Sequence, residues 1–275
     1  MPSMSPQVGF EESPDYVQSL HRGLDVICAF SRDRPAMTLS ELALRTGLSR
    51  AVVRRLLLTL EHLGYIVREG GRAGRLFALS PRILELGLGY ISSLGVARIA
   101  LPVMQDLADR IHESCSLTVL EGEDIVYVQR VAVRKVMTIS LGIGARLPAF
   151  CASMGRVLVA GLDDEKRTRW LRNLEPRAYT PLTVTDKNAL ARELLRVRAQ
   201  GYAYVEQELE EGLCSLAVPI VSACGDTIAA LNAGMPFRAG ARAHALQDVL
   251  PLLQGAARQI EASLPPSQGS SQASA

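Results

Sequence analysis

The feature that most constrains the fold is the segment of residues 38–64, TLSELALRTGLSRAVVRRLLLTLEHLG. Thr38 is a favourable N-cap residue, and Glu41 stands three positions later, at the spacing of a capping box. Gly47 follows the apolar pattern where a left-handed residue commonly ends a helix, and Ser49 can cap a second helix. The pattern therefore predicts two short helices joined by a tight turn.

The second of these helices combines a buried stripe with a basic face. Its apolar residues recur at helical spacing, at Val53, Leu56, Leu57, Leu60 and Leu63. Arg50, Arg54 and Arg55 lie off that stripe, and Arg50 and Arg54 are neighbours on one face, where like charges repel. Such a cluster indicates an anionic partner, although three arginines alone would also fit a solvated face.

The combination of paired helix caps, a short turn and a basic second helix is typical of a helix-turn-helix, whose recognition helix enters the DNA major groove. A strand-like hairpin follows at residues 65–79, with a glycine-rich loop that a winged helix-turn-helix offers to the DNA backbone or minor groove. By itself this hairpin would also fit a plain surface turn. We predict DNA contacts at Thr38, Ser49, Arg50, Ala51, Arg54, Arg55, Arg72 and Arg75.

Upstream, residues 17–30 predict the supporting first helix. Its apolar positions are expected to form one face, at Val17, Leu20, Leu24, Ile27 and Cys28. Residues 14–80 hold ten arginines against six acids, a local charge of +4, whereas the whole chain of 275 residues has a net charge of only +2. This asymmetry places the anionic partner at the N-terminal region.

Composition excludes several other classes. Residues 1–16 lack the apolar core of a signal peptide, and no apolar run reaches the roughly 18–20 residues of a membrane helix, so we expect a cytoplasmic protein with no membrane partner. The five cysteines are scattered without a CxxC pair or a nearby histidine pattern. Neither a disulfide framework nor a zinc site is therefore expected, and no cofactor is predicted.

From residue 116 onward the hydrophobic period changes. Strand-like runs at 117–120, 125–131, 136–141, 203–206, 214–221 and 227–233 interleave with helical segments at 153–160, 164–173, 186–200 and 242–263. Another helix is expected at 96–113. Strand clusters mixed with helices, and connections that do not require parallel strands, predict an α+β domain.

The chain resembles the IclR family of bacterial transcription regulators over residues 15–263. The resemblance is carried by the helix-turn-helix block together with SLHRGLDVICAF, ESCSLTVLEGEDIVYVQRV, LPAFCASMGRVLVA and RAQGYAYVEQELEEGLCSLAVPI. The segments LPAFCASMGRVL and RAVVRRLLLTL look similar to the branch that regulates aromatic-acid catabolism through protocatechuate and β-ketoadipate.

The resemblance implies an α+β protein with an N-terminal winged helix-turn-helix, a linker helix and a C-terminal effector-binding domain with a largely antiparallel sheet. We place a disordered segment at 1–13, the DNA-binding domain at 14–80, the linker helix at 81–95, the effector-binding domain at 96–264 and a disordered tail at 265–275. The resemblance also implies that the protein binds operator DNA as a dimer or as a dimer of dimers. The implied effector is a small organic acid of the protocatechuate, 4-hydroxybenzoate or β-ketoadipate class.

The family's effector pocket maps onto residues of this chain at Ser153, Met154, Glu206, Ser215, Asn232 and Gly234. Ser153 is expected at a helix N-terminus, where backbone N–H groups favour a carboxylate, and it would also serve as a plain N-cap. Met154 and Leu213 are candidates to line the body of the ligand. Glu206 suits an acidic ligand poorly, so it binds a hydroxyl or lies outside the pocket. Arg130, Arg134 and Arg146 are further candidates for pairing a carboxylate.

Two other readings remain open at this stage. The second domain would serve only for assembly if the regulator had no effector. Alternatively, Cys151 would be the nucleophile of a fused enzyme domain, but a cysteine nucleophile needs a partnering base. His21 and His62 belong to the DNA-binding region, and no GxSxG, P-loop, HExxH or GxGxxG pattern is present. We therefore expect no catalytic residues and an apolar packing role for Cys151.

Overall fold

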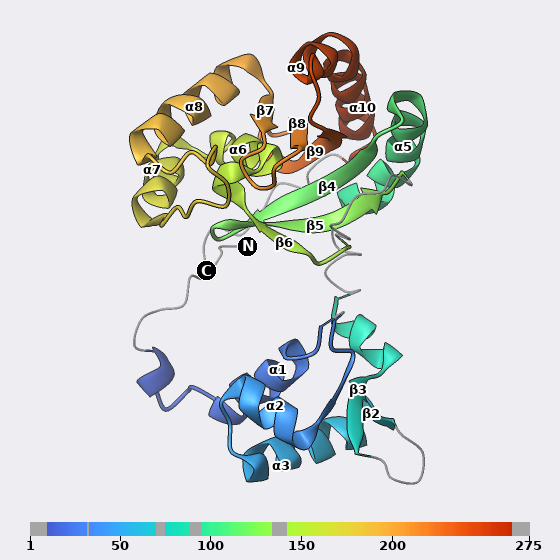
Figure 1. The fold of residues 1–275 in the computed structure, drawn as a ribbon, viewed down its shortest axis with the longest axis vertical. Helices are drawn as coiled ribbons and strands as arrows, with labels where there is room; N and C mark the ends of the chain where they lie inside the picture. Colours follow the sequence, from blue (N-terminus) through green and yellow to red (C-terminus); the bar gives the residue numbers. More distant parts are fainter. Residues whose placement is uncertain (1–9, 32, 70–74, 88–94, 134–141, 266–275) are drawn as a thin grey trace, which may run out of the picture. The chain divides into compact units, whose positions relative to one another are not determined.

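The computed structural model describes residues 10–31, 33–69, 75–87, 95–133 and 142–265 (Figure 1). The chain divides into two compact units, residues 1–93 and 94–275, and each is described by itself. Within the described ranges, every helix is too short or too polar to cross a membrane.

The N-terminal unit is a helical cluster with a small antiparallel sheet. Its helices are η1 (Phe10–Glu12), α1 (Gln18–Cys28), α2 (Leu39–Thr46), α3 (Arg50–His62) and η3 (Pro81–Ile83). Its strands β1 (Ala36–Thr38), β2 (Ile66–Glu69) and β3 (Leu76–Leu79) pair in the order β1-β3-β2. Met37, Leu42, Val53, Leu57 and Ile66 form the centre of its core. The predicted helix pair and hairpin are confirmed, whereas β1 was missed because three residues carry too little periodicity to be recognised.

The predicted helix α1 is confirmed, but much of its predicted apolar face does not pack against the core of this unit. Val17, Leu20 and Leu24 are between 48% and 63% exposed, and the buried residues are Val26 and Ala29. Apolar residues occur on more than one side of this helix, and periodicity alone does not say which side meets the core. Of the predicted linker helix, residues 81–83 form η3 and 84–87 are helical, and the remainder up to Ser93 lies outside the described residues.

The C-terminal unit is built on an antiparallel sheet with helices on both faces (Figure 1). Its described strands are β4 (Ser114–Glu121), β5 (Asp124–Val131), β6 (Arg146–Pro148), β7 (Ala203–Glu206), β8 (Leu213–Val221) and β9 (Thr227–Pro236), in the order β6-β5-β4-β9-β8-β7. Its helices are α5 (Gly95–Ile111), η4 (Ala149–Cys151), α6 (Ser153–Ala160), α7 (Asp164–Asn173), α8 (Lys187–Gln200), α9 (Ala241–His244), η5 (Ala245–Val249) and α10 (Leu250–Ala262). The predicted α+β class with a largely antiparallel sheet is confirmed; the predicted strand at 136–141 lies outside the described residues.

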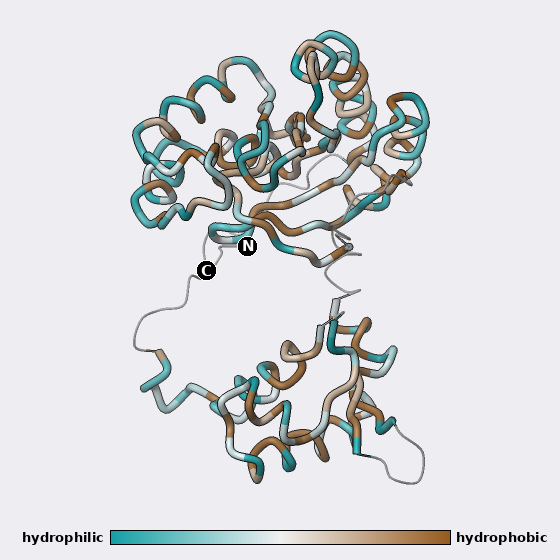
Figure 2. The backbone as a smooth tube through the Cα atoms, viewed as in Figure 1, coloured by the Kyte–Doolittle hydropathy of each residue, from teal (hydrophilic) through white to brown (hydrophobic). Residues whose placement is uncertain are grey.

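Alternation along the strands assigns one core to each face of this sheet. Leu216 and Val218 pack with α5 and α10, whereas Ala217, between them, packs with α6. Figure 2 shows the strands as largely hydrophobic, and α7 and α8 as largely hydrophilic. The start of α6 lies very close to η4, since a Cβ at Gly155 would collide with the backbone of Ala149. The start of α6 is thereby held against η4, and this corner forms one wall of the pocket described below.

Candidate functional site

The turn between α2 and α3 is set by local hydrogen bonds. The Thr38 hydroxyl accepts the N–H of Glu41 at 3.3 Å, and the Glu41 carboxylate accepts the N–H of Thr38 at 2.8 Å, which completes the capping box. Gly47 ends α2 with φ +69°, and the Ser49 hydroxyl accepts the N–H of Val52 at 3.4 Å. The side chains of Thr38 and Ser49 thus fix where α2 and α3 begin.

The outward face of α3 is basic and uncompensated. Arg50, Ala51, Arg54 and Arg55 are all exposed, and none of the three guanidinium groups pairs with an acid among the described residues. Charged side chains held together without a counter-ion favour an anionic partner such as a DNA backbone or base edge. Arg75 is exposed at the start of β3, and Arg72 lies outside the described residues.

One arginine of the hairpin has a structural role that the sequence analysis missed. Arg68 on β2 donates two hydrogen bonds to Glu61 on α3, at 2.8 and 3.0 Å, and its guanidinium lies 5.1 Å from the Phe77 ring centre. This bidentate contact lowers the pKa of Glu61. It joins the hairpin to α3, so that the two candidate DNA-contacting elements hold a fixed geometry relative to each other.

The C-terminal unit contains a cavity of about 270 Å³ at one end of its sheet, on the face covered by α6. Its walls come from strands β4 to β9, from the loop between β7 and β8, and from the η4–α6 corner. Five predicted effector residues line it: Met154, Leu213, Ser215, Asn232 and Gly234. Both apolar and polar residues line the cavity, as is usual for a small-molecule site.

Strand register places the polar side chains of the cavity side by side. Ser116 on β4 pairs with Arg130 on β5 and with Asn232 on β9, and paired residues share a face. The amide oxygen of Asn232 accepts the N–H of Ser116 at 3.1 Å, which leaves its NH₂ group as a donor. The Arg130 guanidinium makes no ion pair with another described residue, so it is available to an anionic ligand.

The structure corrects the roles of two predicted pocket residues. The N-cap of α6 is Ala152; Ser153 is the first helical residue, is fully buried and does not line the cavity. Glu206 also lies outside the cavity and lines a separate depression with Tyr204 and Arg242. For Glu206 this agrees with one of the two alternatives that the sequence left open, because sequence spacing locates a segment but does not say which side of it faces the cavity.

The further arginine candidates divide similarly. Arg130 lines the cavity, whereas Arg146 is occupied by Asp124 at 3.1 Å and by Glu121 at 3.4 Å. Arg134 lies outside the described residues.

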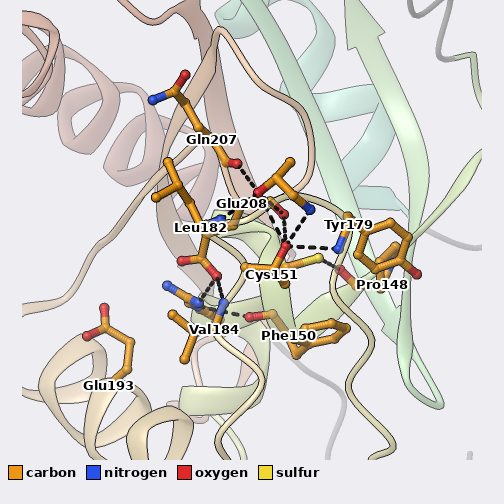
Figure 3. A network of polar contacts seen from close by, with 12 residues as sticks. Pro148, Phe150, Cys151, Tyr179, Leu182, Val184, Glu193, Gln207 and Glu208 are labelled. Atoms are coloured by element: carbon orange, nitrogen blue, oxygen red, sulfur yellow. Dashed lines mark hydrogen bonds and ion pairs between the residues drawn. The ribbon is translucent and has the colours of Figure 1, made fainter.

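A buried ion pair, missed from the sequence, supports the cavity wall (Figure 3). Arg156 on α6 donates to Glu208 at 2.7 Å and to the carbonyl of Phe150 at 2.9 Å, and Glu208 also accepts the N–H of Val184 at 3.0 Å. The side chains of Arg156 and Glu208 are only 4% and 8% exposed. Burial raises the pKa of Glu208, and its two donors act in the opposite direction.

The chemistry of Cys151 argues against a nucleophile. Cys151 lines the cavity, but burial raises the pKa of its thiol to about 12, so the reactive thiolate is not formed near neutral pH. Its sulfur lies 3.8 Å from the carbonyl of Pro148, and no histidine lines the cavity among the described residues. Within the described ranges, no cluster of histidine, cysteine or acidic residues is suited to hold a metal ion.

Comparison with known proteins identifies both units. Residues 88–262 match the family described as bacterial transcriptional regulator IclR, C-terminal, and residues 19–70 match the IclR helix-turn-helix domain. The chain belongs to the IclR family. As an IclR-family protein it is a DNA-binding transcription regulator and not an enzyme, which excludes the cysteine-enzyme reading.

The chain is also similar to individual regulators and to a solved structure that holds a ligand. The chain is 40% identical to the Pca regulon regulatory protein of Pseudomonas putida, over 91% of this chain and 85% of that protein. It is 33% identical to the p-hydroxybenzoate hydroxylase transcriptional activator of Acinetobacter baylyi, over 90% and 91%. An IclR homolog from Microbacterium hydrocarbonoxydans, solved in complex with 4-hydroxybenzoate, is 31% identical with a TM-score of 0.76, over 89% and 98%.

Proposed function

We propose that this IclR-family regulator binds an aromatic acid, or the aromatic catabolite β-ketoadipate, in the cavity of its C-terminal unit, and that the bound acid changes its action at operator DNA. The observation that carries the proposal is the cavity, where an arginine without an ion-pair partner among the described residues and an amide donor adjoin apolar side chains. Similarity to a protein solved with 4-hydroxybenzoate supports the same class of ligand.

The cavity suits a flat acid. Tyr127, Leu147, Met154, Val205 and Leu213 supply an apolar wall for a ring. The acid's carboxylate would be bound by the Arg130 guanidinium and the amide of Asn232. The hydroxyl of Ser215 and the N–H groups at the start of α6 would be further donors to the ligand. Ser153 and Glu206 are left out of this set because neither lines the cavity.

On the DNA side, two copies of α3 are proposed to enter successive major grooves of a pseudo-palindromic operator, with Arg50, Arg54 and Arg55 on bases or phosphates. Arg72 and Arg75 would anchor the hairpin to the backbone. This arrangement requires a dimer or a dimer of dimers. We assign residues 14–80 to DNA binding, 81–95 to the linker and 96–264 to effector binding. The acid must bind two arrangements of the assembly with unequal affinity, since otherwise it shifts nothing.

Fluorescence anisotropy with DNA from upstream of the protein's own gene tests the proposal. The titration is run in a salt series, with and without protocatechuate, 4-hydroxybenzoate or β-ketoadipate. Sequence-selective binding should weaken with salt, because phosphate contacts release counter-ions, and one acid should shift the binding curve. Selective binding that no acid changes would reject the effector class.

Thermal denaturation separates an effector-binding regulator from one whose second domain only assembles. A ligand bound by the native state raises the midpoint of unfolding as its concentration increases. An unchanged midpoint at millimolar concentrations of all three acids would favour the regulator without an effector.

A further inference from the structure

We infer, on the basis of the proposed function, that Glu210 selects hydroxylated aromatic acids by accepting a hydrogen bond from the ring hydroxyl of the effector. Glu210 lies in the loop between β7 and β8 and is one of the residues that line the cavity. Its Oε2 atom is buried and has no hydrogen-bond partner among the described residues. Buried acceptors without partners are rare in folded proteins, so one at a cavity wall indicates a donor supplied by the ligand.

The other acids near this wall have different roles. Glu208 is occupied by Arg156 and by the N–H of Val184. Glu113 lines the cavity but is engaged in an interaction of its own. Glu211 is exposed and does not line the cavity. Glu210 is therefore the acid whose acceptor atom is both buried at the cavity and unused by the described part of the chain.

The loop that carries Glu210 is held in place by hydrogen bonds at both ends. The N–H of Gln207 donates to Leu213 at 2.7 Å, and the N–H of Gly212 donates to the Gln207 side chain at 2.9 Å. The hydroxyls of Thr180 and Thr183 donate to the carbonyls of Gln207 and Glu208, at 2.7 and 2.5 Å (Figure 3). A loop fixed in this way presents its acceptor without an added ordering cost when the ligand binds.

The positions of the charges in the cavity match a ligand with two polar ends. Arg130 is on β5, and Glu210 follows β7 at the other side of the sheet order β5-β4-β9-β8-β7. The loop that carries Glu210 joins β7 to β8, so three to four strand steps, roughly 14–19 Å between backbones, separate it from β5, and the two long side chains shorten this distance from both sides. An acid whose carboxylate pairs with Arg130 would thus direct a hydroxyl on the far side of its ring toward Glu210.

This arrangement makes a chemical prediction about specificity. A site built to pair a hydroxyl rejects the analogue that lacks it, because the buried acceptor is then left without a partner. Benzoate has no such hydroxyl, and 4-methoxybenzoate keeps the oxygen but has no hydrogen to donate. Both should bind more weakly than 4-hydroxybenzoate or protocatechuate.

Isothermal titration calorimetry of the full chain tests the inference with these four acids. The wild-type protein should bind one of the two hydroxylated acids, whichever has the higher affinity, at least tenfold more tightly than benzoate. Glu210→Ala should lose most of that preference. The variant should bind the hydroxylated acid more weakly and should bind benzoate as tightly as the wild type or more tightly. Glu210→Gln keeps an acceptor oxygen and the side-chain shape, so it should retain part of the preference. Glu211→Ala, in the same loop but exposed, should match the wild type.

The outcomes separate this inference from the proposed function. Equal wild-type affinity for benzoate and the hydroxylated acids would overturn the role of Glu210 and leave the aromatic-acid effector standing. An equal loss of both ligands in Glu210→Ala and Glu210→Gln, with unchanged thermal unfolding, would overturn it as well. Absence of binding by all four acids would reject the proposed aromatic effector, and the inference with it.

Discussion

The molecule uses arginine in two opposite ways. On α3, Arg50, Arg54 and Arg55 are exposed, and none pairs with an acid among the described residues. In the C-terminal unit, Arg156 is 4% exposed and is bonded to Glu208 and to a backbone carbonyl. An exposed, unpaired guanidinium loses little by being solvated and is ready for an external anion. A buried guanidinium is stable only with its internal partners, so its loss damages the fold.

The largest effect is expected from breaking the buried pair. Arg156→Ala should destabilise the C-terminal unit by about 3–5 kcal/mol, since Glu208 would remain buried without its counter-ion. Urea unfolding followed by the fluorescence of Trp170, which is hydrogen-bonded within this unit, measures the change. The double variant Arg156→Met with Glu208→Leu should recover much of the loss, because no buried charge remains. A double variant no more stable than Arg156→Ala would contradict this account.

A smaller, functional effect is expected on α3. Arg54→Ala should weaken operator binding by about 1–3 kcal/mol if the guanidinium makes a bidentate contact with a guanine, and folding should be unchanged because the side chain pairs with no acid among the described residues. Anisotropy titration against operator and scrambled DNA measures both affinity and selectivity. Unchanged affinity would remove Arg54 from the interface.

The capping box of α2 provides a third, more modest test. Thr38→Ala should cost about 1 kcal/mol of local stability, which hydrogen exchange of the α2 amides would detect. The hydrogen bonds from Thr38 lower the pKa of Glu41 below its ordinary 4.5. The stabilisation is therefore present above that pH and is lost as the pH falls through the lowered pKa. The variant should show a weaker acid dependence, and an identical pH profile would argue against the box.

The smallest effect is expected at an exposed ion pair that serves as the control for both regions. Arg169 pairs with Glu165 at 2.6 Å, with side chains 65% and 82% exposed. Arg169→Ala should change stability by less than about 0.5 kcal/mol, because water screens the pair, and it should leave operator affinity unchanged. A loss comparable to that of Arg156→Ala would show that burial is not what separates the two classes of arginine.

The sequence predicted those parts of the fold that depend on near neighbours. The bounds of α6, α7 and β7 agree with the predicted ranges, and the caps at Thr38 and Ser49 are where the sequence placed them. These features follow from residues within about one turn of each other, which the chain order displays directly. Which apolar residues of α1 reach the core was not evident from the sequence, since this depends on what the rest of the unit packs against the helix.

The residues proposed for effector binding divide between those that line the cavity and those that do not. The cavity is lined by Met154, Leu213, Ser215, Asn232 and Gly234. For the strand residues, the alternation of side chains along a strand indicates which positions share a face. Ser153 and Glu206 do not line it. Arg130 was one of three equivalent arginine candidates until the register placed it opposite Ser116.

By itself, the sequence determined the local helices and strands, the basic face of α3 and the family, since each depends on the kinds and spacing of residues. The tertiary structure alone decided that Arg156 meets Glu208, 52 positions along the chain, and that Glu210, whose Oε2 atom is buried, lies among the residues that line the cavity. Such contacts join segments that only the folded sheet brings together, and their strength depends on exclusion of water. Neither condition can be seen in the order of residues.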